Sequence, residues 1–163
     1  MEETIKINLG SGNEYLEGYI NVDNQVMFPD AKVDLSINIK DYFANDNFAD
    51  EILVSHVVMY LRPEELQPLL KKWHTILKPT GKLIIETADF KKLAKIVVSE
   101  ESPSTVTNFG LINIFGKEGD PQHRWGWTKQ SLSSELYRAG FSNLKVSKGL
   151  KKPNRDFTIV ATK

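Results

Sequence analysis

The sequence contains no cysteine, and this absence removes several classes of protein at once. Disulfide scaffolds, thiol catalysis and cysteine-ligated zinc are all excluded. Long apolar runs are also missing, since none approaches the roughly 20 residues that span a bilayer. The acidic start Met1-Glu2-Glu3 lacks the basic and apolar regions of a signal peptide. We therefore expect a cytoplasmic protein that does not enter a membrane.

An excess of either charge is absent as well. Lys and Arg total 21, as do Asp and Glu, so the net charge favours neither nucleic acid nor a membrane surface as a partner. The charges are unevenly spread, because residues 1–51 carry three bases and eleven acids whereas residues 138–163 carry seven bases and one acid. The basic run could bind anions through Lys145, Lys148, Lys151, Lys152 and Arg155. Such runs are usually solvated, and we expect two solvated faces.

The 163 residues are 40% apolar and 26% charged, which suits one globular domain over residues 1–163. Apolar patterning and turn residues predict strands at 5–9, 18–23, 32–37, 50–56, 82–87, 142–147 and 157–162, and helices at 63–77, 89–98 and 128–139. The stretch 99–127 is expected to be a loop-rich, irregular insertion that contributes substrate contacts. Alternating strands and helices predict an α/β fold: a mainly parallel sheet covered on both faces, with a closing antiparallel hairpin at one edge.

The opening of the chain predicts a ligand site. The first strand ends in Gly10-Ser11-Gly12, where a backbone without side chains lets a ligand approach closely. The second strand ends in Asp23 and would lie beside the first. A carboxylate there can accept hydrogen bonds from both hydroxyls of a ribose. These residues together indicate a nucleoside-containing cofactor.

The spacing after the glycines narrows the choice of cofactor. Five residues separate Gly12 from Gly18, enough for about one helical turn. A dinucleotide-binding unit has a third glycine and a full helix aimed at the pyrophosphate. A cofactor without phosphate is therefore favoured, and a nicotinamide-dependent oxidoreductase is a distant alternative.

The ordered set of motifs resembles a known family over nearly the whole chain. The segments NLGSG, GYINVD, VDLSIN, DNFADEILVSH, LKPTG, ADF, HRWGWT and AGF are similar in kind and order to the type 11 class of S-adenosylmethionine-dependent methyltransferases. The resemblance implies a class I, Rossmann-like methyltransferase fold of seven strands, S-adenosylmethionine as cofactor, and methyl transfer to a small or flexible acceptor. The residues it assigns to the cofactor are Leu9, Gly10, Ser11, Gly12, Asp23, Asn38, Ile39 and Ser55.

Candidate catalytic residues follow from the chemistry of methyl transfer and from where the histidines lie in the predicted elements. Methyl transfer depends mainly on positioning, and a general base helps when the acceptor keeps its proton until reaction. His56 follows a strand that should end at the cofactor, and His123 lies in the insertion, so either could be that base. The alternative for His56 is a structural role in which its ring is hydrogen-bonded. Arg124, Trp125 and Trp127 would contact the acceptor, with packing of the insertion as the alternative. The three histidines are too dispersed to predict a metal site.

Two departures from the family pattern leave a second function open. Asn38-Ile39 stands where the family commonly has Asp-Leu, and Met59-Tyr60-Leu61 stands where it often has Glu-His-Leu. The missing Glu-His pair suggests an alternative in which the chain binds S-adenosylmethionine as the inactive subunit of a partner protein.

Overall fold

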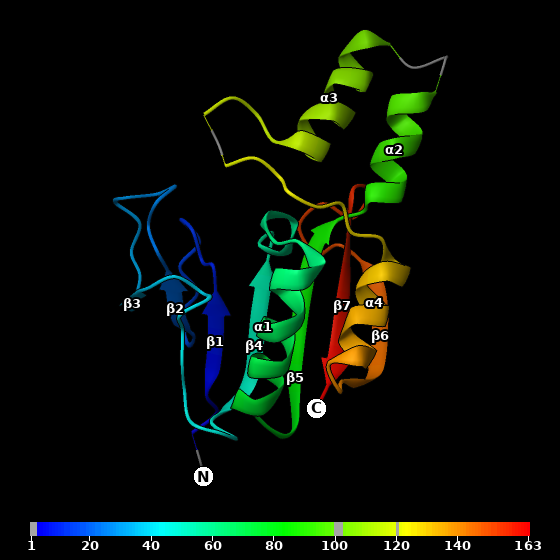
Figure 1. Ribbon diagram of the computed structural model, residues 1–163. Helices are drawn as coiled ribbons and strands as arrows, with labels where there is room; N and C mark the ends of the chain where they lie inside the picture. The colour runs from blue at the N-terminus through cyan, green and yellow to red at the C-terminus, as the bar shows by residue number, and fades with distance from the viewer. Residues whose placement is uncertain (1–2, 100–102, 120) are drawn as a thin grey trace.

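The apolar stretches of the chain form the strands of one sheet (Figure 1). The computed structural model describes residues 3–99, 103–119 and 121–163. The strands are β1 (Lys6–Leu9), β2 (Ile20–Asp23), β3 (Leu35–Ser36), β4 (Ala49–Ser55), β5 (Leu77–Ala88), β6 (Ser142–Lys148) and β7 (Asp156–Thr162). The helices are the 3₁₀ helix η1 (Val58–Tyr60) and the α-helices α1 (Pro63–Ile76), α2 (Phe90–Val98), α3 (Ser104–Phe115) and α4 (Lys129–Arg138).

The seven strands lie in the order β3-β2-β1-β4-β5-β7-β6. Strand β1 pairs in parallel with β2 and β4, β2 with β3, and β4 with β5, whereas β7 runs antiparallel to both β5 and β6. The predicted seven-stranded, mostly parallel sheet with an antiparallel hairpin at its edge is confirmed. The reversed strand of that hairpin, β7, inserts between β5 and β6.

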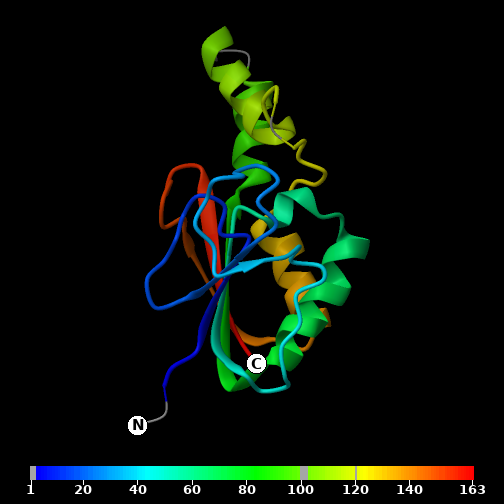
Figure 2. The same cartoon turned by 90° about the vertical axis from the view of Figure 1, so that its left-hand side faces the viewer.

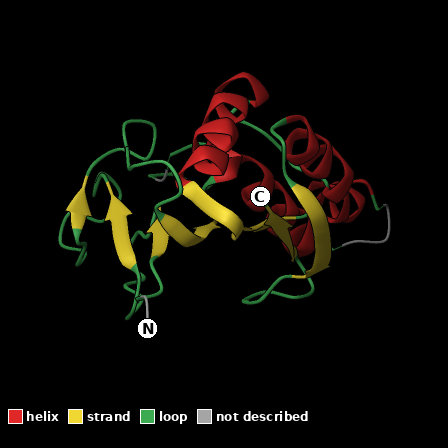
Figure 3. Ribbon diagram, turned by 90° about the horizontal axis from the view of Figure 1, so that it is seen from below, coloured by secondary structure: helices red, strands yellow, loops and turns green. Residues whose placement is uncertain are grey.

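Helices α1 and α4 pack on the same face of the sheet (Figure 3). The side chains on this face are completely buried, as Ile52, Leu83 and Ile159 show. Their neighbours Leu53 and Ile84 point to the opposite face and are only half-buried. The expectation that helices cover both faces was wrong for the described residues. Residues 10–19, which join β1 to β2, form turns and irregular structure and no helix, so this connection does not cover the opposite face.

Helix α1 supplies much of the core. It begins at Pro63, and the Glu65 carboxylate accepts a hydrogen bond from the Arg62 backbone N–H at 3.0 Å, which caps the first turn. Its buried stripe includes Leu66, Leu70 and Trp73, each without exposed surface. Within the described residues no helix has the length and apolar character needed to cross a membrane.

The expected irregular stretch 99–127 contains helix α3, so that expectation was wrong for these twelve residues. The sequence of α3 is rich in Thr, Val and Asn, which have low helix propensity. Packing on α2 overrides that preference: Gly110 is buried, and a Cβ added there would lie 2.7 Å from the Val97 Cγ2 atom. The pair α2 and α3 extends beyond the end of the sheet (Figures 1 and 2).

Candidate functional site

The glycine turn follows β1 and is fastened to β2. The backbone N–H groups of Gly10 and Ser11 both donate to the Val22 carbonyl, at 2.8 and 3.1 Å. Gly10 has φ 72° and Gly12 has φ 54°, conformations that favour glycine. A Cβ on Gly10 would lie 2.4 Å from the Val57 Cγ2 atom. The turn is therefore fixed in place before any ligand binds.

Asp23 ends β2 beside this turn. One carboxylate oxygen accepts the Gly12 N–H at 3.0 Å, and the other accepts the Gln25 N–H at 2.7 Å. A carboxylate can accept about four hydrogen bonds, so each oxygen keeps capacity for one more. The backbone thus orients Asp23 as an acceptor for a pair of hydroxyl groups.

A cavity of about 510 Å³ opens over the carboxyl ends of β1, β2 and β4. Seven of the eight residues assigned to the cofactor by sequence line it: Gly10, Ser11, Gly12, Asp23, Asn38, Ile39 and Ser55. Leu9 does not line it, and its side chain is completely buried in the core. Side chains alternate along a strand, so Leu9 points with Ile7 toward the helices.

Two hydroxyl groups in this cavity have no internal partner. The Ser11 and Ser55 Oγ atoms are buried and make no hydrogen bond within the described residues. Buried polar atoms are nearly always paired, so two orphaned hydroxyls in one cavity point to a ligand that supplies the partners. Together with the carboxylate of Asp23, they form a polar set that fits the amino-acid and ribose parts of S-adenosylmethionine.

Part of the cavity wall was not predicted from the sequence. Val26, Met27 and Phe28 line it from the irregular segment between β2 and β3. The Phe28 ring lies so close to Gly12 that a Cβ there would be 3.1 Å from the Phe28 Cε2 atom. This apolar wall suits the flat face of a purine. No periodicity marks such a loop, so sequence patterning could not find it.

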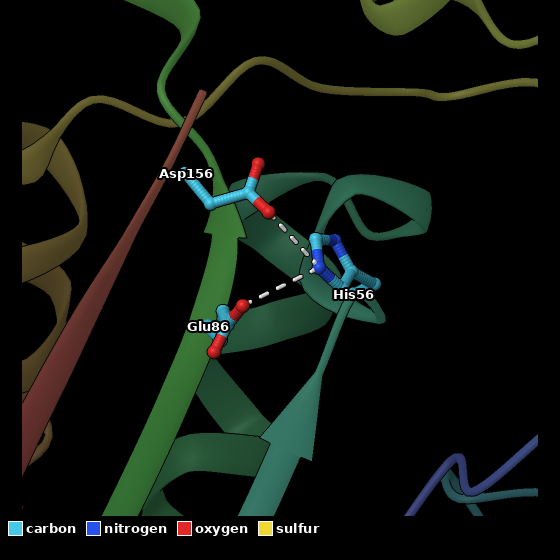
Figure 4. A group of neighbouring side chains, drawn as sticks. All are labelled: His56, Glu86 and Asp156. Atoms are coloured by element: carbon cyan, nitrogen blue, oxygen red, sulfur yellow. Dashed lines mark ion pairs between the residues drawn. The ribbon is translucent and has the colours of Figure 1, made fainter. Parts of the chain in front are cut away.

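His56 lies at the far end of the cavity, directly after β4 (Figure 4). Its Nε2 atom is 3.2 Å from the Asp156 Oδ2 atom and 3.7 Å from the Glu86 Oε1 atom. Both carboxylates are buried, and His56 has the positive φ angle of 55°. Such backbone strain is found in functional regions. Sequence analysis missed both acids, because their distant segments meet only in the folded sheet.

The two acids are held by their own partners. Glu86 accepts hydrogen bonds from the backbone N–H groups of Leu150 and Lys151, each at 3.2 Å. Asp156 accepts from the Arg155 Nη2 atom at 2.9 Å. Burial acts to raise the pKa of Asp156, but the hydrogen bonds from His56 and Arg155 outweigh it and leave that pKa below its ordinary value. Asp156 is therefore ionised at neutral pH.

His56, Glu86 and Asp156 also have the donor types of a metal site, with ligand atoms within 4.8 Å of one another. The sequence predicted no metal site. The geometry is accounted for without one, because the imidazole hydrogen-bonds to Asp156 and the Arg155 guanidinium already balances that carboxylate. We therefore treat these residues as a hydrogen-bonded acid–base group.

A second, smaller cavity of about 290 Å³ adjoins the first and shares His56 and Tyr60 with it. His123 lines this second cavity, with its Nδ1 atom 3.1 Å from the Asn113 carbonyl and its ring edge-on to Tyr60. Burial is the main cause that lowers the pKa of His123 below its usual value. The structure thus brings the two candidate histidines to one cavity.

Arg124, Trp125 and Trp127 line neither of these two cavities. Trp127 is buried, and its indole N–H donates to the Val58 carbonyl at 2.8 Å. Arg124 pairs with Glu65 at 2.8 Å, and its backbone N–H and that of Trp125 both donate to the Met59 carbonyl. Packing of the insertion, the alternative left open by the sequence, describes these residues better than contact with an acceptor.

No protein-family model matches the sequence, and no curated protein does, so the type 11 resemblance is not confirmed at the level of the family. Solved structures do match. A SAM-dependent methyltransferase from Archaeoglobus fulgidus has a TM-score of 0.70 at 19% identity, over 98% of this chain and 86% of its own. A putative S-adenosylmethionine-dependent methyltransferase from Listeria monocytogenes gives 0.68 at 13% identity, over 99% and 91%.

Human N-acetylserotonin methyltransferase, solved in complex with SAM, gives a TM-score of 0.64 at 14% identity, over 98% of this chain but 47% of its own. At such identities the likeness concerns the fold alone. The fold is therefore that of the Rossmann-like methyltransferases.

Proposed function

We propose that this chain binds S-adenosylmethionine in the larger cavity and transfers its methyl group to a small acceptor bound in the smaller one. The observation that carries the proposal is the junction of the two cavities at His56, with Asp23 and the glycine turn at the other side of the larger cavity. The fold agrees with this assignment. No feature of the site favours the alternative of an inactive partner subunit.

The cofactor would be held by groups that the fold has already oriented. Asp23 would accept hydrogen bonds from the two ribose hydroxyls, and the turn Gly10-Ser11-Gly12 would pass beneath the methionine part. Ser55 lies next to His56 and would face the sulfonium region. When bound, the cofactor supplies an electrophilic methyl group. Because this methyl is already activated, the main task of the protein is to align the acceptor with it.

His56 would accept the proton that the acceptor loses. A hydrogen bond from Nε2 to Asp156 would keep the ring proton on that atom, so that Nδ1 would be the atom that accepts a proton. Glu86 and Asp156 would stabilise the imidazolium that forms, as buried acids do beside a general base. His123 lines the same cavity in the neutral form that its lowered pKa favours, and would contact the acceptor.

Thermal unfolding in the presence of candidate cofactors tests the proposal. A ligand that binds only the folded state raises Tm. S-adenosylhomocysteine and S-adenosylmethionine should raise the Tm of the purified protein in proportion to the logarithm of their concentration, and NADH should not. A shift with NADH alone, or with none of the three, would reject the proposed function.

A further inference from the structure

The smaller cavity is lined by an excess of basic side chains. Among the described residues, its lining includes the cations Lys117, Lys151, Lys152 and Arg155 and one carboxylate, that of Glu14. Glu14 pairs with Lys151, and Asp156, which lies outside the lining, pairs with Arg155, so the charge that stays unbalanced includes that of Lys152. A partly open cavity with this balance of charge carries a positive potential, because charges of one sign gather along its walls.

Three of these cations belong to the basic run that the sequence suggested would be solvated. Lys151, Lys152 and Arg155 come from the turn between β6 and β7, which carries them over the cavity. Lys145 and Lys148 lie on β6, are exposed, and are not part of the lining. Lys151 and Lys152 are exposed as well, so the expectation of solvated lysines holds for the turn too, although the turn also brings them to the cavity wall.

Two of these cations, Arg155 and Lys151, are held in place by partners, and the side chain of the third, Lys152, is not held within the part of the chain that the structure describes. Arg155 donates through Nη1 to the Asn113 side chain at 2.6 Å and through Nη2 to Asp156, which fixes the plane of its guanidinium and leaves further N–H groups unused. Lys151 pairs with Glu14, and burial lowers the pKa of its ammonium. Lys152 is exposed and takes part in no ion pair among the described residues.

The positive charge around this cavity also affects the pKa of His123. Burial is the largest cause of the lowered pKa of His123, and the positive charge of Arg155 lowers it further. A cavity that disfavours one more positive charge on its wall is suited to a ligand that brings a negative one. Its volume of about 290 Å³ limits that ligand to a small molecule.

We propose that the acceptor carries an oxyanion group, a carboxylate or a phosphate, which binds between Lys152 and Arg155 and so directs the reacting atom toward His56. This inference rests on the proposed function in treating the cavity as the acceptor site. Charge-assisted hydrogen bonds to Arg and Lys are the common way in which proteins recognise both groups.

The three histidines make the site observable by NMR, since His56 and His123 line the cavity whereas His74 lies on α1 against Phe141. The probes are benzoate, its neutral counterpart benzamide, and phenyl phosphate, each titrated into the full chain with and without S-adenosylhomocysteine. Benzoate or phenyl phosphate should shift the imidazole signals of His56 and His123 but not those of His74, and benzamide should shift none. Whichever of the two acids binds with the lower Kd shows whether the site prefers a carboxylate or a phosphate.

Lys152→Glu and Lys145→Glu form the matched pair of variants. Both change charge equally on exposed side chains, and only the first alters the cavity. Lys152→Glu should weaken binding of the acid roughly fivefold or more, as expected for removing and reversing one accessible charge pair, and Lys145→Glu should not change it.

Equal binding of benzoate and benzamide, equal loss in both variants, or the absence of shifts with either acid would overturn the inference. Binding of the acids at the histidines without any binding of S-adenosylhomocysteine would support the anion site while rejecting the methyltransferase function. The two proposals therefore fail separately.

Discussion

Gly10 illustrates at the scale of one residue how the site is preorganised. Its conformation, with φ 72°, and its contact with Val57 come from the fold and not from a ligand. The sequence could predict the turn because glycines after a short strand have few other uses. It could not show that Val57, from the segment after β4, closes the space above Gly10.

Gly10→Ala should destabilise the protein by about 1–3 kcal/mol more than Gly18→Ala, since overpacking adds to the strain of a positive φ. Gly18 is the matched control because it has φ 79° and no heavy atom within 4 Å of an added Cβ. Urea unfolding of both variants measures the difference. Equal losses would show that Val57 moves aside without cost.

Protonation of Asp156 at low pH should lower the free energy of unfolding. Its pKa is lowered in the folded state, so the stability it contributes is present above the pKa of the unfolded chain and is lost as pH falls through the folded value. At pH 7 Asp156→Asn should lower the free energy of unfolding by about 3 kcal/mol, because Arg155 and His56 lose a buried charged partner.

The same variant should show a weaker fall in stability below about pH 4. Chemical unfolding between pH 3 and 7 checks this, with the exposed Asp30→Asn as control. A parallel pH dependence in wild type and Asp156→Asn would contradict the assigned ionisation.

At the scale of the element, helices α2 and α3 depend on each other. The buried Gly110 lets α3 approach Val97 and Ile96 of α2 closely. Gly110→Leu should separate the two helices and speed amide exchange in α3, while exchange in β4 stays unchanged, because the pair lies beyond the sheet and opens locally. Hydrogen exchange followed by mass spectrometry measures this. Faster exchange in β4 as well would show that the pair is part of the global core.

Helices with a clear apolar spacing or a clear capping residue were predicted well from the sequence. Elements that depend on tertiary packing were not. The three helices predicted at 63–77, 89–98 and 128–139 lie close to their true bounds, and Asp89 and Thr128 cap the second and third of them. Strand β3 has two residues where six were expected. Helix α3 was missed because its stability comes from contact with α2, which no local pattern records.

At the scale of the whole molecule, the proposed function depends on which residues the order of the strands brings together. The order β3-β2-β1-β4-β5-β7-β6 sets the ends of β1, β2 and β4 around one cavity and brings Glu86 and Asp156 to His56 in its wall. For the larger cavity, the sequence pattern indicated Gly10, Gly12 and Asp23, and the family resemblance added Asn38, Ile39 and Ser55. For the smaller cavity, the sequence offered only His56 and His123, because most of the other lining residues come from η1, α3 and the β6–β7 turn, which meet only in the fold.

The central claim is tested most directly by calorimetric titration of S-adenosylhomocysteine into the wild-type protein and into Asp23→Ala, with the exposed Asp30→Ala as control. The account predicts saturable binding at one site, weakened by about 1–3 kcal/mol in Asp23→Ala because hydrogen bonds to a charged group are lost, and unchanged in Asp30→Ala. Asp23→Asn, which keeps one acceptor oxygen, should lie between. Absence of binding to the folded wild type, or equal affinity in Asp23→Ala, would contradict the account.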